Sequence, residues 1–260
     1  MQKGTWIPMK LMMPNKTEWE TNPVLLDALG LDKVSSPIVS IVGGGGKTST
    51  LEQLTREYDR KGKPVIVTTT THMMPPKHWP WCKIESVEVV DRYLEEEAVV
   101  WIGLQSETGK MKSPDLEFLK KLASKKLPMI IEADGAKRLP FKVPGEWEPV
   151  ILEESTMIIG VLGMDALGKP LKEKCFRYEL ASKLLEKPED SRITKEDYTK
   201  VIINNWGLKK GLHKNMDYAV ILNKVDNDQR LKDALSIRDM VSKLGIGRVY
   251  LSSYNTYINK

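Results

Sequence analysis

Short apolar runs alternate with amphipathic stretches along most of the chain. The runs are short enough for buried strands, and they cover residues 38–42, 65–67, 98–103, 129–131, 157–162, 218–222 and 248–251. Between them, apolar residues recur at spacings of three and four, which predicts helices over residues 23–29, 48–61, 87–97, 114–124, 175–185, 194–206 and 231–244. Such alternation predicts an α/β fold with a mostly parallel sheet and helices on both faces.

Local signals indicate where several helices begin. Thr194, with Asp197 three residues later, predicts a helix start, and Ser113 is the expected N-cap of the helix that follows it. Asn22 and Pro23 predict the cap and first residue of the short helix near the N-terminus. Proline, glycine and polar residues predict loops at residues 73–82, 108–113, 139–149 and 163–170.

The chain has 260 residues, which fits one α/β domain, with residues 1–22 packed on its edge or loosely placed as an extension. Its net charge of +5 comes from 40 basic and 35 acidic residues spread along the chain, so neither nucleic acid nor a membrane is an expected partner. Two cysteines suit a reducing compartment. No apolar run approaches a membrane span or a secretion signal, so we expect a cytoplasmic protein.

A phosphate-binding loop is predicted after the first buried strand. Gly43, Gly44, Gly45 and Gly46 precede Lys47, Thr48 and Ser49, where the helical pattern begins. Glycines allow backbone N–H groups to approach phosphate, the lysine reaches the β- and γ-phosphates, and the threonine hydroxyl binds Mg²⁺. The usual pattern has its first glycine at the position of Ile41. The loop must therefore start later or bend differently.

Threonines end the second predicted strand, at residues 68–71, followed by His72. Because ligand groups lie at the carboxyl ends of parallel strands, we expect Thr69 and Thr70 to contact the nucleotide or its metal. Threonine is also favoured in strands for its shape alone. His72, His78 and Cys82 could meet at a metal, but their spacing matches no closed zinc pattern, so chance placement in a loop is favoured.

Acidic residues end the strand over 129–131. Glu132 and Asp134 point to the same side of a strand, and such carboxylates hold Mg²⁺ or position an attacking water. We expect Asp134 to bind Mg²⁺ with Thr48. Four nearby cations are candidates for an anionic substrate or a phosphate. They are Lys137, Arg138, Lys142 and Arg177.

The strand over 218–222 ends in the guanine-reading pattern Asn-Lys-x-Asp. Asp226 can accept hydrogen bonds from both N1–H and the 2-amino group of guanine, a donor pair that adenine lacks. Asn223 is expected to hold the loop, and the stem of Lys224 to cover the base. Ser252 and Ser253 end the last strand and could contact guanine as well. GTP is therefore expected in preference to ATP.

The order of these motifs resembles that of the YqeC family. The segments that carry the resemblance are 43–48, 68–72, 132–135, 142–150, 163–168 and 223–226, within residues 23–255. This family is associated with selenium-dependent molybdenum hydroxylases, as accessory proteins, and its fold is akin to the metallochaperone GTPases that serve nickel enzymes. Trp147 and Phe176 stand where the family commonly has histidine.

The resemblance implies a Mg²⁺-dependent GTPase-type accessory protein whose partner is a molybdenum hydroxylase or another cofactor-maturation protein. Lys47, Glu132 and Asp134 are its expected catalytic residues. Segments 69–72 and 135–149 would sense the γ-phosphate. A P-loop kinase or nucleotidyltransferase for a small anionic molecule is an alternative, and a non-catalytic nucleotide-binding scaffold is another.

Overall fold

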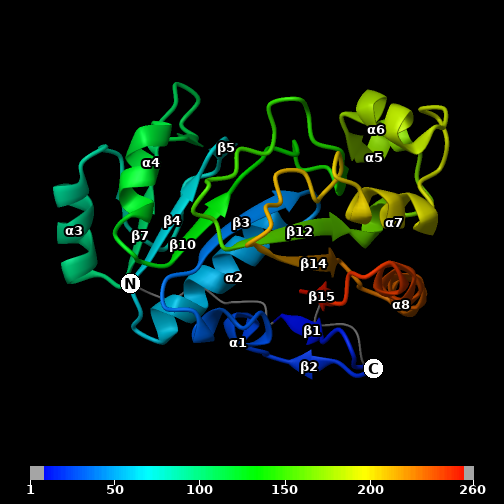
Figure 1. Ribbon diagram of the computed structural model, residues 1–260, viewed down its shortest axis with the longest axis horizontal. Coiled ribbons are helices and arrows are strands. Elements are labelled where there is room, and N and C mark those ends of the chain that lie inside the picture. The colour runs from blue at the N-terminus through cyan, green and yellow to red at the C-terminus, as the bar shows by residue number, and fades with distance from the viewer. Residues whose placement is uncertain (1–8, 255–260) are drawn as a thin grey trace.

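A computed structural model describes residues 9–254 of the chain. Its centre is a ten-stranded sheet in the order β2-β1-β15-β14-β12-β3-β10-β4-β7-β6 (Figure 1). The strands from β15 to β6 pair in parallel, and β1 and β2 add an antiparallel hairpin at the β15 edge. The sheet strands are β1 Lys10–Met12, β2 Glu20–Thr21, β3 Ile38–Gly43, β4 Val65–Thr69, β6 Trp81–Cys82, β7 Val99–Ile102, β10 Met129–Glu132, β12 Met157–Gly163, β14 Asp217–Asn223 and β15 Val249–Ser253.

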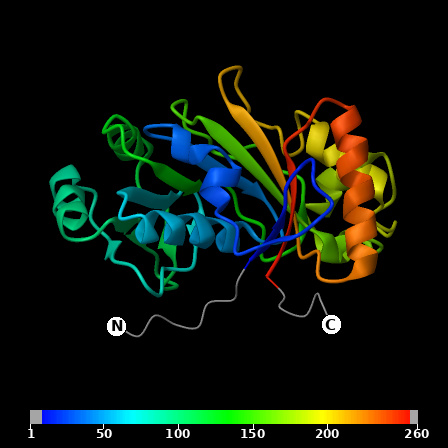
Figure 2. The same cartoon turned by 90° about the horizontal axis from the view of Figure 1, so that it is seen from below.

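Helices cover both faces of this sheet, which confirms the predicted fold class. The helices are α1 Leu25–Ala28, α2 Lys47–Arg60, α3 Val87–Glu96, α4 Leu116–Ala123, α5 Leu171–Lys174, α6 Tyr178–Leu185, α7 Lys195–Ile203 and α8 Asp228–Lys243, with 3₁₀ turns η1 Leu31–Lys33 and η2 Met164–Ala166. Alternate residues of β3 separate the two layers, because successive side chains of a strand point to opposite faces. Val39 and Ile41 pack with α1 and α2, whereas Ile38 packs with α3 and α4. Viewed from below, α2 crosses the sheet between α3 at one end and α8 at the other (Figure 2).

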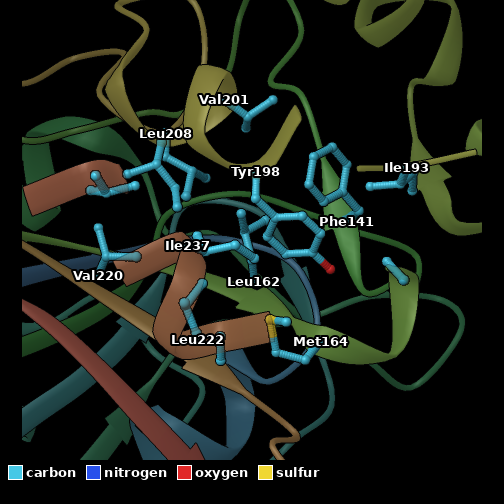
Figure 3. Close-up of a cluster of buried hydrophobic side chains, with 14 of the residues drawn as sticks. Phe141, Leu162, Met164, Ile193, Tyr198, Val201, Leu208, Val220, Leu222 and Ile237 are labelled. Atoms are coloured by element: carbon cyan, nitrogen blue, oxygen red, sulfur yellow. The ribbon is translucent and has the colours of Figure 1, made fainter. Parts of the chain in front are cut away.

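A third hydrophobic cluster lies under α5 to α8. Tyr198 is fully buried there, with its ring edge-on to Phe141 at 4.8 Å between centroids (Figure 3). Its hydroxyl donates a 2.6 Å hydrogen bond to the carbonyl of Gly163. This contact ties α7 to the carboxyl end of β12. Two small sheets complete the fold: β11 Phe141–Lys142 pairs with β13 Cys175–Phe176, and β9 Met111–Lys112 lies between β5 His72–Met73 and β8 Leu104–Gln105.

The described part of the N-terminal segment adds a two-stranded hairpin to the sheet. Leu11 and Met12 are fully buried, and β1 pairs with β15. Residues 9–22 are therefore an edge hairpin and not a loose extension, while residues 1–8 lie outside the described residues.

Several predicted helix ends are wrong, and tertiary contacts explain them. Helix α1 begins at Leu25 because its first amides donate to the Glu57 carboxylate of α2 at 2.9 and 2.7 Å, and Asn22 is no cap. Asp115 caps α4, because the Ser113 hydroxyl bonds to a carbonyl instead. The predicted start at Thr194 is confirmed as a capping box, but α7 stops at Ile203. The expected helix over 175–185 begins only at Tyr178, after the strand β13, and the expected turn over 108–113 contains β9.

Candidate functional site

The glycine loop follows β3, and connections between strands run in opposite directions across the sheet on the two sides of β3. β3 is flanked by β10 and β12; the chain goes from β3 to β4 on one side, and later from β12 to β14 on the other. Ligands of open parallel sheets bind at the carboxyl ends of strands at such a point. The segments that follow β3, β4, β10 and β14 therefore lie together at the carboxyl ends of the parallel strands.

The loop is short because β3 continues through Gly43. Ile41, at the usual position of the first glycine, is a fully buried strand residue, so the loop starts late, one of the two possibilities expected. The N–H groups of Gly44 and Gly45 donate to backbone carbonyls at 2.8 and 3.1 Å, and that of Gly43 donates to Asp134 at 3.0 Å. These amides hold the loop in shape. The N–H groups that could bind an anion are those at the start of α2, because they have no hydrogen-bond partners within the helix.

Gly45 and Gly46 leave no room for a side chain. Their φ angles are 74° and 149°, in the region that favours glycine. A Cβ atom on Gly46 would collide with the side-chain amide of Asn223, and one on Gly45 would collide with the backbone of Gly163. The loop is thus packed against β12 and β14 and is not a flexible linker.

Lys47 is turned back onto the loop that precedes it. Its Nζ donates to the Gly43 carbonyl at 2.7 Å and lies 3.2 Å from Oδ1 of Asp134. Among residues 9–254 that oxygen accepts no hydrogen bond, so the second contact is an attraction between charges without hydrogen-bond geometry. Lys47 is 5% exposed and borders the pocket described below.

Glu132, rather than Asp134, contacts the threonine of the loop. The Thr48 hydroxyl donates to Oε2 of Glu132 at 3.1 Å, and both residues border the pocket. Burial raises the pKa of the Glu132 carboxyl, although Lys47 and the Thr48 hydroxyl act against that rise. A buried carboxylate beside a hydroxyl offers hard oxygen ligands that suit Mg²⁺. These two residues fit the ion better than Thr48 and Asp134, which the sequence suggested.

Asp134 belongs to a buried network of charges. Lys142 is fully buried, with Nζ 2.9 Å from Asp134 Oδ2 and 2.9 Å from Glu148 Oε2. The same Nζ donates to the Gly135 carbonyl, and Arg177 Nε donates to Glu148 Oε2 at 3.2 Å. Burial alone would raise the pKa of Glu148, but the bonds from Lys142 and Arg177 outweigh it and lower the pKa. Lys142 and Arg177, expected to bind an anionic substrate, are instead committed to protein carboxylates.

The threonines after β4 divide into structural and pocket residues. The Thr69 hydroxyl donates to the carbonyl of Glu132 at 2.9 Å, and that of Thr70 donates to the carbonyl of Val150 at 3.2 Å. Neither borders the pocket, whereas Thr71 and the following histidine do. At this strand end the pocket is thus lined by Thr71 and His72, and not by Thr69 and Thr70.

One pocket of about 560 Å³ opens over the loop and the acidic strand end. Its wall includes Gly45 to Ser49 from the loop and Glu132 from β10. On its other sides lie Lys137 and Arg138, together with Phe176. Lys110, Met73 and Met74, from the three-stranded β5-β9-β8 sheet and its flanks, also line the pocket. Glu148 and Lys224 complete the lining.

Asn223 joins the carboxyl end of β14 to the glycine loop. Its side-chain Nδ2 donates to the Gly45 carbonyl at 2.9 Å, and its Oδ1 accepts from the Ser252 hydroxyl at 2.9 Å. The loop after β14 is thereby fixed relative to both the glycine loop and β15. The sequence separation of 178 residues gives no local signal of this contact.

Asp226 faces a serine and an arginine. Oδ1 accepts from the Ser253 hydroxyl at 2.6 Å, and Oδ2 lies 3.3 Å from Arg230. Asp226 is 27% exposed and does not border the pocket, whereas Lys224 does. The Lys224 ammonium pairs with Asp165 at 2.8 Å. Sequence reasoning did not single out Asp165, and it included Thr71 and Glu148 only within the segments 69–72 and 135–149, because only their spatial neighbours distinguish them from ordinary turn residues.

Within residues 9–254, no group of three or more His, Cys, Asp and Glu could hold a metal ion, so His72, His78 and Cys82 do not form a centre. Both cysteines are buried, and burial raises the pKa of Cys175 to about 12. In the same range, no helix has the length and apolarity needed to cross a membrane.

Comparison with known proteins supports the resemblance of the motifs. The family described as "YqeC protein" matches residues 39–179, which is more than half of the chain. The "Uncharacterized protein YqeC" of Escherichia coli (strain K12) is 34% identical over 136 residues, covering 50% of this chain and 53% of that relative. The match thus spans about half the length of the relative. No solved structure matches the chain. The extent of the family match and the order of the motifs around the pocket show that the chain belongs to the YqeC family.

Proposed function

We propose that this protein binds a Mg²⁺–guanine nucleotide and hydrolyses GTP slowly. The hydrogen bond between Asn223 and Gly45 carries the proposal. It joins a segment with guanine-reading chemistry to a loop with phosphate-binding chemistry, so a single nucleotide can span both. Neither segment alone would distinguish a nucleotide site from a turn.

The phosphates would lie against the start of α2. The first amides of this helix and its partial positive charge attract anions, and Lys47 would leave the Gly43 carbonyl to bind the β- and γ-phosphates. The Thr48 hydroxyl and Glu132 would hold Mg²⁺, directly or through water. Bound there, the ion would neutralise phosphate charge. Asp134, already close to Lys47, would keep that side chain in position.

The base would lie beside Lys224 and Asp226. Oδ2 of Asp226 has only a long, partly exposed contact with Arg230, which guanine can replace with its N1–H and 2-amino donors. The Ser253 hydroxyl holds the other oxygen and orients the carboxylate. Adenine lacks this donor pair and would gain neither bond, a difference of about 1–3 kcal/mol in favour of guanine.

The biological role that we propose rests on the family. By the resemblance, the protein would assist the maturation of a selenium-dependent molybdenum hydroxylase, with that enzyme or another maturation protein as partner. Segments 69–72 and 135–149, which both border the pocket, would sense the γ-phosphate and pass its state to the partner. Hydrolysis would be slow without the partner.

Titration of the protein with fluorescent GTP and ATP in magnesium buffer tests the proposal. We expect GTP to bind at least tenfold more tightly than ATP, and Lys47→Ala to abolish the binding of both. Equal affinity, or a preference for ATP, would remove guanine recognition. Absence of any purine nucleotide binding would remove the whole proposal.

A kinase or nucleotidyltransferase is the second candidate, because Lys137 and Arg138 border the pocket without ion pairs among residues 9–254. Phosphate release without an acceptor, lost in Lys47→Ala, would favour hydrolysis. Release that depends on an anionic acceptor, with a modified product, would favour transfer. Binding without turnover under either condition would leave a nucleotide-binding scaffold.

A further inference from the structure

Two long cationic residues occupy a turn in which such side chains are uncommon. Lys137 and Arg138 have φ angles of 45° and 63°, and the Leu139 N–H donates to the Ala136 carbonyl at 2.8 Å. Positive φ at both central positions is the pattern of a type I′ turn, for which Asn-Gly is strongly preferred. Residues with a Cβ atom adopt this conformation at a cost, and such strain gathers at functional sites.

The turn is fixed against the phosphate loop. The Gly45 N–H donates to the Leu139 carbonyl at 3.1 Å, and the Gly163 N–H donates to the Pro140 carbonyl at 2.8 Å. A Cβ atom on Gly44 would also collide with the Leu139 carbonyl oxygen. The backbone from which Lys137 and Arg138 project therefore keeps a constant position relative to any phosphate held at the start of α2.

Both cations border the pocket with exposed side chains. Within residues 9–254, neither takes part in an ion pair, although Lys137 Nζ lies 5.4 Å from the centroid of Phe176. Lys142 and Arg177 approach the same ring at 5.5 and 5.0 Å, but both are paired with Glu148. The charges of Lys137 and Arg138 thus remain available to an anion in the pocket.

We propose that Lys137 and Arg138 bind the terminal phosphate of the nucleotide and so make the site selective for triphosphate over diphosphate. This inference rests on the proposed nucleotide binding. The α2 amides and Lys47 hold phosphates from one wall, and the turn supplies two donors from another. The bonds from these two cations to a phosphate would offset the conformational cost of the turn. This explains why a strained turn carries two cations that have no ion pair in the described part of the chain.

The test replaces the turn with its preferred sequence, in Lys137→Asn/Arg138→Gly. We expect a higher melting temperature, because the strain is relieved, together with an affinity for Mg²⁺–GDP within threefold of the wild type. Affinity for a non-hydrolysable Mg²⁺–GTP analogue should fall at least tenfold. Lys137→Gln/Arg138→Gln keeps the strained turn and removes the charges, so it should lose the analogue without gaining stability.

Lys126→Gly is the matched control, since Lys126 also has a positive φ of 54° but is exposed after α4 and away from the pocket. It should raise the melting temperature and change neither affinity. An unchanged ratio of analogue to GDP affinity in both double variants would overturn the inference while leaving nucleotide binding intact. That unchanged ratio is the result expected if Lys137 and Arg138 bind a separate anionic ligand instead of the terminal phosphate. A wild-type protein that binds neither nucleotide would overturn both proposals.

Discussion

Asn223 and Gly45 lie 178 residues apart in the sequence, and the side-chain amide of Asn223 donates a 2.9 Å hydrogen bond to the Gly45 carbonyl. The adjacent Gly46 has no room for a Cβ atom because the same amide fills that space. The two candidate halves of the nucleotide site are thus packed against each other. Preorganisation of this kind reduces the entropy lost on binding.

Gly46→Ala should destabilise the protein by about 2–4 kcal/mol, because the new methyl group meets both the Asn223 amide and an unfavourable φ. Urea denaturation measures the change. Gly62→Ala is the control, since Gly62 has a φ of 60° but open space around its Cβ, and it should cost only about 1 kcal/mol. If the clash is the cause, Asn223→Ala should recover part of the loss in the double variant. Strict additivity would contradict it.

Lys142→Met should destabilise the protein by about 3–5 kcal/mol, because it leaves Asp134 and Glu148 without their shared buried partner. Urea denaturation at pH 7 measures the difference. Lys172→Met removes an exposed ion pair with Asp190 and should change stability by no more than about 0.5 kcal/mol. Equal losses of unfolding free energy in the two variants would show that the buried network stabilises the protein no more than an exposed ion pair does.

Glu132→Gln should stabilise the magnesium-free protein at neutral pH. The pKa of Glu132 is raised above its ordinary value of 4.5, chiefly by burial, so the folded state binds this proton more tightly than the unfolded state. The associated stability is present below pH 4.5 and is lost as the pH rises through the folded-state pKa. Thermal melts from pH 4 to 8 in EDTA should show a flatter profile for the variant. Addition of Mg²⁺ with nucleotide should stabilise the wild type more than the variant.

Glu148→Gln should have the opposite pH dependence. The bonds from Lys142 and Arg177 outweigh burial and lower the pKa of Glu148, so its stability is present above pH 4.5 and is lost as the pH falls through the folded-state pKa. The variant should be less stable than the wild type at pH 7 and should approach it in acid. The same melts measure both carboxylates, and parallel profiles for the two variants would contradict the assignment.

Asp226→Asn should weaken guanine nucleotide binding by about 1–3 kcal/mol and reduce the preference over adenine, because an amide nitrogen cannot accept from guanine N1–H. Competition between GTP and ATP for a fluorescent analogue gives the ratio. Asp228→Asn, on an exposed residue at the start of α8, should leave the ratio unchanged. A preserved ratio in Asp226→Asn would mean that the base is read elsewhere.

The sequence by itself determined the parallel strands β3, β4, β7, β10, β12, β14 and β15 and most of the helices, because side-chain periodicity and glycine or capping residues act over a few residues. It also marked the Gly43–Thr48 loop, the acidic strand end and the Asn223–Asp226 segment as chemically related. The tertiary structure decided which groups meet. Thr48 contacts Glu132 instead of Asp134, and Lys142 is buried between two carboxylates.

The same limit explains the misplaced helix ends and the hairpin at residues 10–21. Glu57 caps α1 from another helix, and β1 finds its partner in β15 at the far end of the chain. Hydrogen bonds and ion pairs depend on the spatial approach of their atoms and not on their order in the chain. Only the folded backbone therefore fixes which charged and polar groups face the pocket and which support its walls.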